Sequence, residues 1–488
     1  MIDSVSKINY NFCMDDHLQE KCAVVGVWDT HNDVARTAYF ALFAQQHRGQ
    51  EQSGIAVITD QGIHAHKASG LVSQVYTEEI IQSLKGTVAI GHNRYSTSKG
   101  VNISHAQPVV IQDIALAHNG NLPSVKALES FVSCYGRDTS ECSDSELMAM
   151  AIQVYREKGE LLSKAILCAT KLFTGSYSAV ALGDNSLVAF RDPCGIRPLS
   201  IGILPSGGYV VASETCALQT VSAVFFRDVA PGEIVTIDKD GLRSEIFAQP
   251  NQKIDAFEFV YFARHDSTIL GRSVYQTRYD AGEELAKEHT LPIDVVVPVP
   301  ETSIPAALGY AMTRNIPFHL ALNKNRYIHR TFIEPQQKDR DKNVHMKFTV
   351  ISSLVAGKRV ALIDDSIVRG TTSRQIIKMI FEAGAKEVHF LSVSPPVRFP
   401  DFYGIDTPNQ KNLIAAIKTI DEIREYLGAT EVHYLSLDGL VRAIGLPREN
   451  LCLSCFNGEY PIDLGERMTD VSYTRPDRPH CNVLGSSC

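Results

Sequence analysis

The 488-residue sequence contains no long hydrophobic run. No stretch approaches the roughly 18 uncharged apolar residues that a membrane-spanning helix requires. The first 20 residues are charged and lack an apolar core, so we expect neither a membrane anchor nor a secretory signal. An excess of positive charge is also missing, since 47 basic and 55 acidic residues give a net charge of −8. We therefore expect no nucleic-acid partner, although a local cationic pocket for phosphate is compatible with this balance.

A disulfide framework is not evident either. The 11 cysteines are scattered along a chain that is far longer than small disulfide-stabilised proteins. We therefore expect a reducing compartment, the cytoplasm. Hydrophobic residues make up 44% of the sequence and charged residues 21%, which is typical of soluble globular proteins. A chain of this length predicts two or three domains.

The first half of the chain has the pattern of a sheet-rich domain. Turn residues separate short apolar runs at Cys22–Trp28, Gly54–Ile58, Thr87–Gly91, Ile114–Ala117, Tyr177–Leu182, Ser186–Phe190, Leu199–Ile203 and Gly208–Ala212. Apolar residues at helical spacing predict helices at Val34–Gln46 and Ser143–Lys158. Strands packed beneath helices indicate a layered α+β domain.

After residue 255 strands and helices alternate. Continuous apolar runs at Ile293–Val299, Arg359–Ile363 and Val388–Val393 are typical of buried parallel strands. Helices are predicted after the first two runs, over about 304–312 and 372–383. This alternation predicts an open, mostly parallel α/β sheet. The highly charged segment 325–347 is expected to form a long functional loop.

A phosphate-binding loop follows the second of these strands. The strand ends in Asp364 and Asp365, and a helix begins after the sequence Arg369-Gly370-Thr371-Thr372-Ser373. Backbone N–H groups at a helix start favour an anion, and the hydroxyl groups can donate further hydrogen bonds. The two carboxylates would bind ribose hydroxyls or Mg²⁺. The alternative is an ordinary capped helix, but a cap does not account for two acids at the end of a strand.

Cys22 opens the first apolar run and is a candidate nucleophile. Taken alone, it would be a small hydrophobic core residue. Arg94 could grip an α-carboxylate, while the Asn119 amide and the Gly120 N–H could stabilise an oxyanion. Asp144 could hold an α-ammonium group, or it could instead cap a helix. A nucleophile, an anion clamp, an oxyanion hole and a cation site together suit hydrolysis of an amino-acid amide.

Together these motifs resemble those of the glutamine phosphoribosylpyrophosphate amidotransferases. Matching motifs also stand at His47-Arg48-Gly49-Gln50-Glu51, at 191–199 and at Lys324-Asn325-Arg326-Tyr327. The resemblance implies a leader at 1–21, a glutaminase domain of the N-terminal-nucleophile type (layered αββα) at 22–250 and a type I phosphoribosyltransferase domain at 255–445. A C-terminal extension containing Cys-x-x-Cys would then occupy 446–488.

The resemblance also implies an activity. Glutamine hydrolysed at Cys22 would supply ammonia through an internal channel to phosphoribosylpyrophosphate, yielding 5-phosphoribosylamine, the first committed step of purine synthesis. Arg94 and Asp144 would bind glutamine, and the Asp364–Ser373 loop would bind phosphoribosylpyrophosphate. Mg²⁺ would lie at Asp364 and Asp365 near Ser303, and a lid would bring Arg330 and Lys338 over the substrate. A homotetramer and inhibition by purine nucleotides are further expectations.

The sequence departs from this family at several positions. Many members bind a [4Fe–4S] cluster through four cysteines. Cys452 and Cys455 match two of these ligands, but Asp255 and Asp401 stand at the other two positions. Carboxylates are poorly matched to such a cluster, so we expect none that is stable. His265 stands where the family usually has proline, and Lys21 precedes the nucleophile where glutamate is usual.

Two rival functions remain at this point. A sugar-phosphate amidotransferase would share the glutaminase half, but it would lack the Asp364–Ser373 motif. A non-catalytic sensor of phosphoribosylpyrophosphate would have no need of Cys22, Arg94 and Asn119 together.

Overall fold

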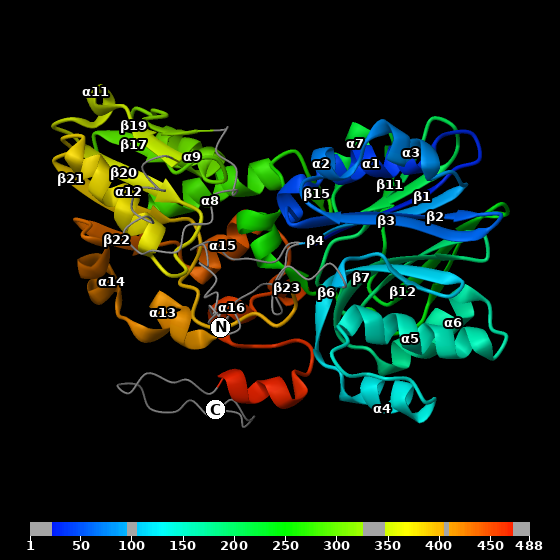
Figure 1. Cartoon of the computed structure of the whole chain (residues 1–488). Helices are drawn as coiled ribbons and strands as arrows, with labels where there is room; N and C mark the ends of the chain where they lie inside the picture. Colours follow the sequence, from blue (N-terminus) through cyan, green and yellow to red (C-terminus); the bar gives the residue numbers. More distant parts are fainter. Residues whose placement is uncertain (1–21, 95–104, 326–346, 405–408, 472–488) are drawn as a thin grey trace, which may run out of the picture.

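The computed structural model describes residues 22–94, 105–325, 347–404 and 409–471 of the chain. Two parts lie side by side in Figure 1. A sandwich of two antiparallel sheets, blue to green, occupies one side, and a parallel sheet, mostly yellow and orange, occupies the other. The predicted fold class is confirmed, while the exact domain boundaries stay a prediction.

The first sheet of the sandwich has β1 at its centre. Its strand order is β11 (Val224–Asp228), β9 (Ser200–Ile203), β10 (Tyr209–Ala212), β1 (Ala23–Trp28), β4 (Val88–Arg94), β2 (Gln52–Thr59) and β3 (Gly62–Ser69). Neighbouring strands are antiparallel, and β1 pairs with β4 on one side and β10 on the other. Side chains alternate across β1, so Val25 and Val27 pack toward the covering helices while Val24 faces the second sheet.

The second sheet carries the other half of the sandwich. Its order is β13 (Gly241–Ile246), β12 (Glu233–Asp238), β8 (Ser186–Arg191), β7 (Thr174–Gly183), β6 (Ile114–Ser124) and β5 (Val109–Ile111). Helices α1 (Val34–Ala44), α2 (Val72–Val75), α3 (Glu78–Ser83) and α7 (Thr215–Thr220) are associated with the first sheet, and α4 (Lys126–Cys134), α5 (Asp144–Glu157) and α6 (Leu162–Ala169) with the second. Each outer layer buries an apolar helix face, which gives the expected αββα order.

The second part is built on a four-stranded parallel sheet. Its order is β17 (Val295–Pro298), β20 (Arg359–Asp364), β21 (Glu387–Ser392) and β22 (Glu431–Tyr434). One face packs on α8 (Val274–Glu288), α9 (Ile304–Arg314) and α15 (Leu437–Ile444), and the other on α12 (Thr371–Glu382) and α14 (Ile420–Leu427). Both faces are therefore buried, which explains the continuous apolar runs of these strands.

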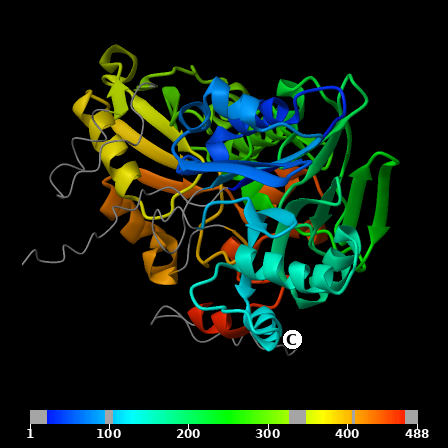
Figure 2. The same cartoon turned by 45° about the vertical axis from the view of Figure 1, so that its right-hand side comes forward.

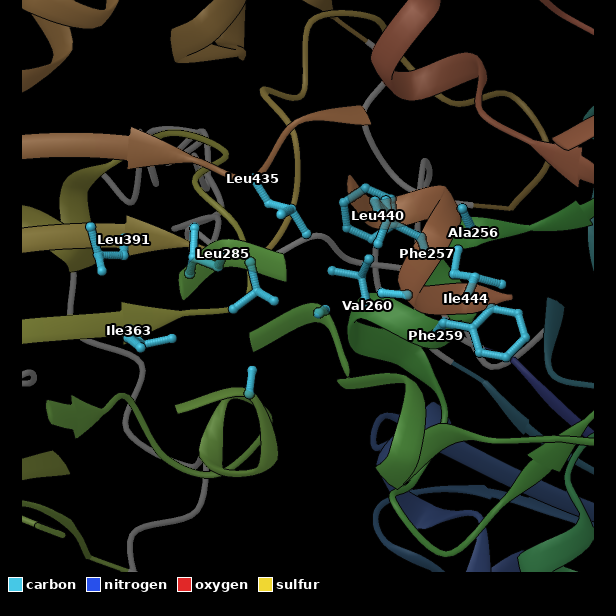
Figure 3. Packing of buried hydrophobic residues seen from close by; sticks show 14 of the residues in the cluster. Ala256, Phe257, Phe259, Val260, Leu285, Ile363, Leu391, Leu435, Leu440 and Ile444 are labelled. Carbon is cyan, nitrogen blue, oxygen red and sulfur yellow. The ribbon is translucent and has the colours of Figure 1, made fainter. Parts of the chain in front are cut away.

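The core beneath α8 and α9 continues toward the sandwich. Figure 3 shows Ile363 and Leu391 from the strands and Leu285 from α8 in one cluster with Phe257 and Val260. Residues Glu258–Phe262 form a short π-helical turn that connects the two parts of the molecule. A separate apolar cluster joins the two parts, with Cys194 and Ile196 of the sandwich packed against Phe402 and Tyr403.

A buried group of charged side chains also crosses this junction. The Arg48 guanidinium of the sandwich pairs with Glu214 at 2.6 Å and with Glu258 of the connecting turn at 2.6 Å. Arg197 pairs with the same Glu258 and with Asp255, both at 3.1 Å. All of these side chains are almost fully buried. Because desolvated charges are stable only when paired, their contacts fix how the two parts meet.

The chain finally returns to the sandwich. Figures 1 and 2 show the last described segment, in red, next to α4. Its turn Gly465–Val471 is joined to β6, where the Ser124 hydroxyl donates to the Glu466 carboxylate at 2.8 Å. Among the described residues, no helix is both long enough and apolar enough to cross a membrane.

We predict that Glu258→Gln will strongly destabilise the chain. The substitution leaves the buried Arg48 and Arg197 guanidinium groups short of a counter-charge, and breaking a buried pair in this way costs about 3–5 kcal/mol. Urea unfolding would measure the loss. Glu78→Gln is the control, because it breaks the exposed Arg36–Glu78 pair and should change stability little. Equal effects of the two substitutions would contradict the importance that we assign to the buried group.

Candidate active site

Cys22 lies immediately before the central strand β1 and is half-buried. The Arg48 Nε donates a hydrogen bond to its carbonyl oxygen at 3.1 Å. The pairing of Ala23 with Asn93 brings Cys22 to the end of β4, where the next residue is Arg94. The Arg94 guanidinium is held by the Gln52 side-chain oxygen at 3.2 Å. The predicted nucleophile and the predicted carboxylate clamp therefore lie at the same edge of the sheet.

Ser213 links this edge to the predicted oxyanion residues. Its hydroxyl oxygen accepts hydrogen bonds from the Val24 N–H at 3.0 Å and from the Asn119 side-chain amide at 3.4 Å. Sequence reasoning missed Ser213. The available signal was weak, a small polar residue directly after the buried run that ends at Ala212.

Gly120 follows Asn119 in β6 and has a φ of 147°. A Cβ atom at this position would collide with the Ser176 backbone oxygen of the paired strand. Only glycine therefore fits without displacing β7, and its N–H lies on a backbone that this pairing holds in place.

Asp144 is the first residue of α5, but it does not cap the helix. Ser143 is the cap and forms a capping box with Glu146, so the alternative role that we considered for Asp144 is wrong. The Asp144 carboxylate instead accepts a hydrogen bond from the Leu122 N–H at 3.1 Å. It also lies 3.8 Å from His118 Nδ1, beside the Asn119–Gly120 pair.

Asp364 and Asp365 occupy the carboxyl end of β20, where both side chains are buried. Burial and the adjacent Asp365 carboxylate raise the pKa of Asp364 well above its usual value. The Asp365 N–H donates to Asp364 Oδ1 at 2.9 Å, and the Ser366 hydroxyl donates to Asp365 Oδ1 at 2.8 Å. Two neighbouring buried carboxylates repel each other, so the pair suits a hard cation, which relieves this repulsion.

The predicted phosphate loop leads directly into α12. Gly370 is the N-cap, with φ of 80°, and it has no side chain to occupy the helix end. Ser373 is buried, Thr372 and Arg369 are half-buried, and Thr371 is exposed. A helix of 12 residues thus begins with three hydroxyl side chains beside its N-terminus, as an anion-binding loop requires.

Ser303 and Asp365 line one cavity, together with Arg278, Thr302, Phe259 and Val260. The Ser303 hydroxyl donates to the Val299 carbonyl, so the structure gives it a backbone partner.

The buried Arg278 was not predicted. Arg278 is one cation within an amphipathic helix, and no local motif around it indicates a role in the site. Its guanidinium donates to the Phe259 and Ala263 carbonyls at 2.8 and 2.9 Å, which fixes a positive charge beside Asp365.

His265 connects Arg278 to the loop that carries Ser303. Its Nδ1 lies 3.0 Å from Arg278 Nη1, and its Nε2 lies 3.2 Å from the Glu301 carbonyl oxygen. Burial, with the nearby Arg278, lowers the pKa of His265 to about 4. A neutral ring satisfies both contacts, since Nδ1 can accept from arginine while Nε2–H donates to the carbonyl.

The residues at the cluster positions do not fit an iron–sulfur cluster. Asp255 is ion-paired with Arg197, and the Asp401 carboxylate accepts from the Tyr403 N–H at 2.7 Å. Burial raises the pKa of the Asp255 carboxyl to about 7 and the pKa of the Cys452 and Cys455 thiols well above their usual value. A cluster needs thiolates, whereas these four groups favour their protonated or ion-paired forms.

Two predicted features lie outside the described residues. These are the leader 1–21 and the lid residues Arg330 and Lys338.

Comparisons with known proteins identify the family. The family described as "Glutamine amidotransferase domain" matches residues 92–220. An amidophosphoribosyltransferase of Synechococcus elongatus is 44% identical over 461 residues, covering 93% of this chain and 94% of that protein. The chain belongs to the amidophosphoribosyltransferase family. The family member of Bacillus subtilis is 41% identical and covers 92% of this chain and 95% of its own length.

A solved structure agrees with this family assignment. The glutamine phosphoribosylpyrophosphate amidotransferase of B. subtilis, complexed with ADP and GMP, superposes with a TM-score of 0.85 at 40% identity. The match covers 91% of this chain and 98% of that one. Both halves of the amidotransferase architecture are therefore present.

We predict that the chain, purified without oxygen and incubated with iron and sulfide, will acquire no [4Fe–4S] cluster. The physical reason is that Asp255 and Asp401 leave two thiols where a cluster needs four, and that Asp255 is already paired with Arg197. Iron analysis and visible absorption would check this. Four irons per chain with the broad absorption of a cluster would show the prediction to be wrong.

A second prediction concerns pH. The folded chain keeps His265 neutral down to about pH 4, whereas the unfolded chain protonates this group below about 6.5. The unfolded state therefore binds more protons between these values, and His265 destabilises the fold as pH falls through this window. Between pH 7 and 4, the unfolding free energy of His265→Gln should fall by less than that of the wild type. The difference should be about 1–2 kcal/mol, a value that allows for the partial exposure of the ring. Urea unfolding at several pH values would measure this difference. An identical dependence of unfolding free energy on pH in the two proteins would refute the prediction.

Proposed function

We propose that the chain transfers the amide nitrogen of glutamine to phosphoribosylpyrophosphate, forming 5-phosphoribosylamine, glutamate and pyrophosphate. This is the first committed step of purine synthesis. The observation that carries the proposal is the identity of 40–44% with amidophosphoribosyltransferases over more than nine-tenths of the chain. The geometry agrees, because a glutaminase-like edge around Cys22 and a phosphate loop after Asp365 lie on two joined parts.

The glutaminase step is assigned to the edge of the first sheet. We propose that removal of residues 1–21 frees the α-amine of Cys22, which takes the thiol proton as the sulfur attacks the amide carbon. Ammonia leaves with that proton, and water then hydrolyses the thioester to glutamate. Asn119 and the Gly120 N–H would stabilise the oxyanion. Arg94 would hold the substrate carboxylate and Asp144 its ammonium group.

The transferase step is assigned to the carboxyl end of the parallel sheet. Asp364 and Asp365 would bind the ribose hydroxyls, and the loop Arg369–Ser373 would bind the 5′-phosphate. The two carboxylates, with Ser303 nearby, would also hold Mg²⁺, which when bound offsets the charge of the pyrophosphate leaving group. Ammonia would attack C1 of the ribose as pyrophosphate departs. The apolar side chains Phe259 and Val260 at the cavity wall would help to exclude competing water.

Several further properties are proposals of the same kind. Arg330 and Lys338 would cover the bound phosphates from a lid. Ammonia would reach the second site inside the molecule rather than through solvent. The ADP and GMP held by the B. subtilis structure support inhibition by purine nucleotides. A homotetramer in the cytoplasm is also proposed, and the eight cysteines within the described residues, none of which forms a disulfide, suit a reducing compartment.

The decisive experiment supplies glutamine, Mg²⁺ and phosphoribosylpyrophosphate and measures glutamate and pyrophosphate in the same tube. Cys22→Ala should lose glutamine-dependent pyrophosphate formation by about 10³-fold or more, since the nucleophile is gone. With ammonia as the donor, the same variant should keep its activity. Cys134→Ala, at an exposed cysteine, is the matched control and should keep both activities.

Each alternative outcome has a distinct meaning. Formation of glutamate without pyrophosphate would show that the second site only senses phosphoribosylpyrophosphate or that it uses another acceptor. Glutamine-dependent activity in Cys22→Ala would remove Cys22 from the mechanism.

A further inference from the structure

A group of histidines lies at the opposite end of the parallel sheet from the phosphate loop. His389 belongs to β21 and is paired in register with Glu431 at the start of β22. His289 is the C-cap of α8 and packs against both. Asp364 pairs with Ser392, three residues further along β21, so the histidines lie about 10 Å from the catalytic edge. The group is therefore separate from the active site.

Three of these side chains converge on one point. Glu431 Oε2 lies 3.2 Å from His289 Nε2 and 3.0 Å from His389 Nδ1. One ligand atom from each residue lies within 4.8 Å of the other two. In the part of the chain that the structure describes, this is the one group of at least three His, Cys, Asp or Glu residues with that geometry. Two imidazole nitrogens and a carboxylate oxygen are a suitable ligand set for Zn²⁺.

The second nitrogen of each imidazole is also held. His289 Nδ1 contacts the Tyr310 hydroxyl at 2.7 Å, and His389 Nε2 contacts the Glu387 carboxylate at 3.1 Å. Metal-binding histidines are oriented in this way, by an outer acceptor that fixes the tautomer and turns the lone pair of the other nitrogen toward the metal. Both rings are thus arranged to present a lone pair toward Glu431.

A hydrogen-bonded cluster without a metal explains the arrangement less well. His389 has a carboxylate oxygen beside each ring nitrogen, Glu431 Oε2 at Nδ1 and Glu387 Oε2 at Nε2, and a neutral imidazole has only one N–H to donate. Its side chain is only 4% exposed, and the His289 ring lies 5.8 Å away. A cation between His389 Nδ1 and Glu431 accepts electron pairs from both atoms.

Solvent can reach the site, and a further histidine lies nearby. The Glu431 side chain is 31% exposed, so the site reaches solvent on one side. The His433 ring lies 5.6 Å from that of His289, and its Nε2 faces the Glu288 carboxylate at 3.9 Å.

We propose that His289, His389 and Glu431 form a binding site for one divalent transition-metal ion of the Zn²⁺ class. The ion joins the C-terminal end of α8 to the starts of β21 and β22, and water completes its coordination. Nitrogen ligands select such ions over Mg²⁺, which prefers oxygen. Because the folded chain alone assembles the ligands, binding stabilises the fold.

The test is a titration of the full-length, chelator-treated chain with Co²⁺ in excess Mg²⁺, which occupies oxygen-rich sites such as Asp364 and Asp365. We expect about one equivalent to bind with d–d absorption bands and without the charge-transfer band of a cobalt–thiolate bond. That band distinguishes this site from Cys452 and Cys455. Zn²⁺ should displace Co²⁺ and raise the melting temperature.

Two variants make the assignment specific. Glu431→Gln removes a ligand and Glu387→Gln removes an outer acceptor, and each should weaken Co²⁺ binding by about 10-fold or more. Both side chains are partly exposed, so at least one variant should fold. Glu382→Gln, on the outer surface of α12, is the matched control and should bind normally. Absence of binding, binding only with a thiolate band, or equal affinity in all variants would overturn the proposal.

Discussion

The buried pairing of Arg48 with Glu258 is the contact on which the rest of this molecule depends. Arg48 supports the Cys22 carbonyl with its Nε and binds Glu258 with its terminal nitrogens. Glu258 begins the turn whose Phe259 and Val260 line the cavity beside Asp365. One side chain therefore touches the backbone of the predicted nucleophile and the segment that forms the wall of the second site. Since neither charge can be left alone in a dry interior, both parts must adopt a single relative placement.

The two proposed sites use the same physical device in different sheets. In each, a buried strand ends where polar groups are needed, β4 at Arg94 and β20 at Asp364. The strand supplies rigidity, and the residue at its end is free to meet a ligand. Glycine then allows close backbone approach at Gly120 against β7, and a left-handed backbone at Gly370 before α12. Rigid placement of charges in a water-poor setting strengthens their effect on a reacting substrate.

The departures from the family pattern have compensating contacts in the fold. His265, which stands where proline is usual, bonds both Arg278 and the Glu301 carbonyl. Asp255, which stands at a cluster position, pairs with Arg197, whose guanidinium also reaches the Tyr403 carbonyl at 3.0 Å. A charge pair and hydrogen bonds thus crosslink the segments that a cluster would otherwise join.

The sequence by itself determined the elements with strong periodicity and the residues within local motifs. The buried runs that became β1, β20 and β21 and the loop from Asp364 to Ser373 are readable because their signals lie within a few neighbouring residues. The edge strand β3 was missed, because one of its faces is in solvent and its sequence is largely polar. Only the tertiary structure decided the positions of Ser213, Arg278 and the histidines around Glu431. Their partners lie tens to hundreds of residues away, and no local pattern specifies which distant groups the packing brings together.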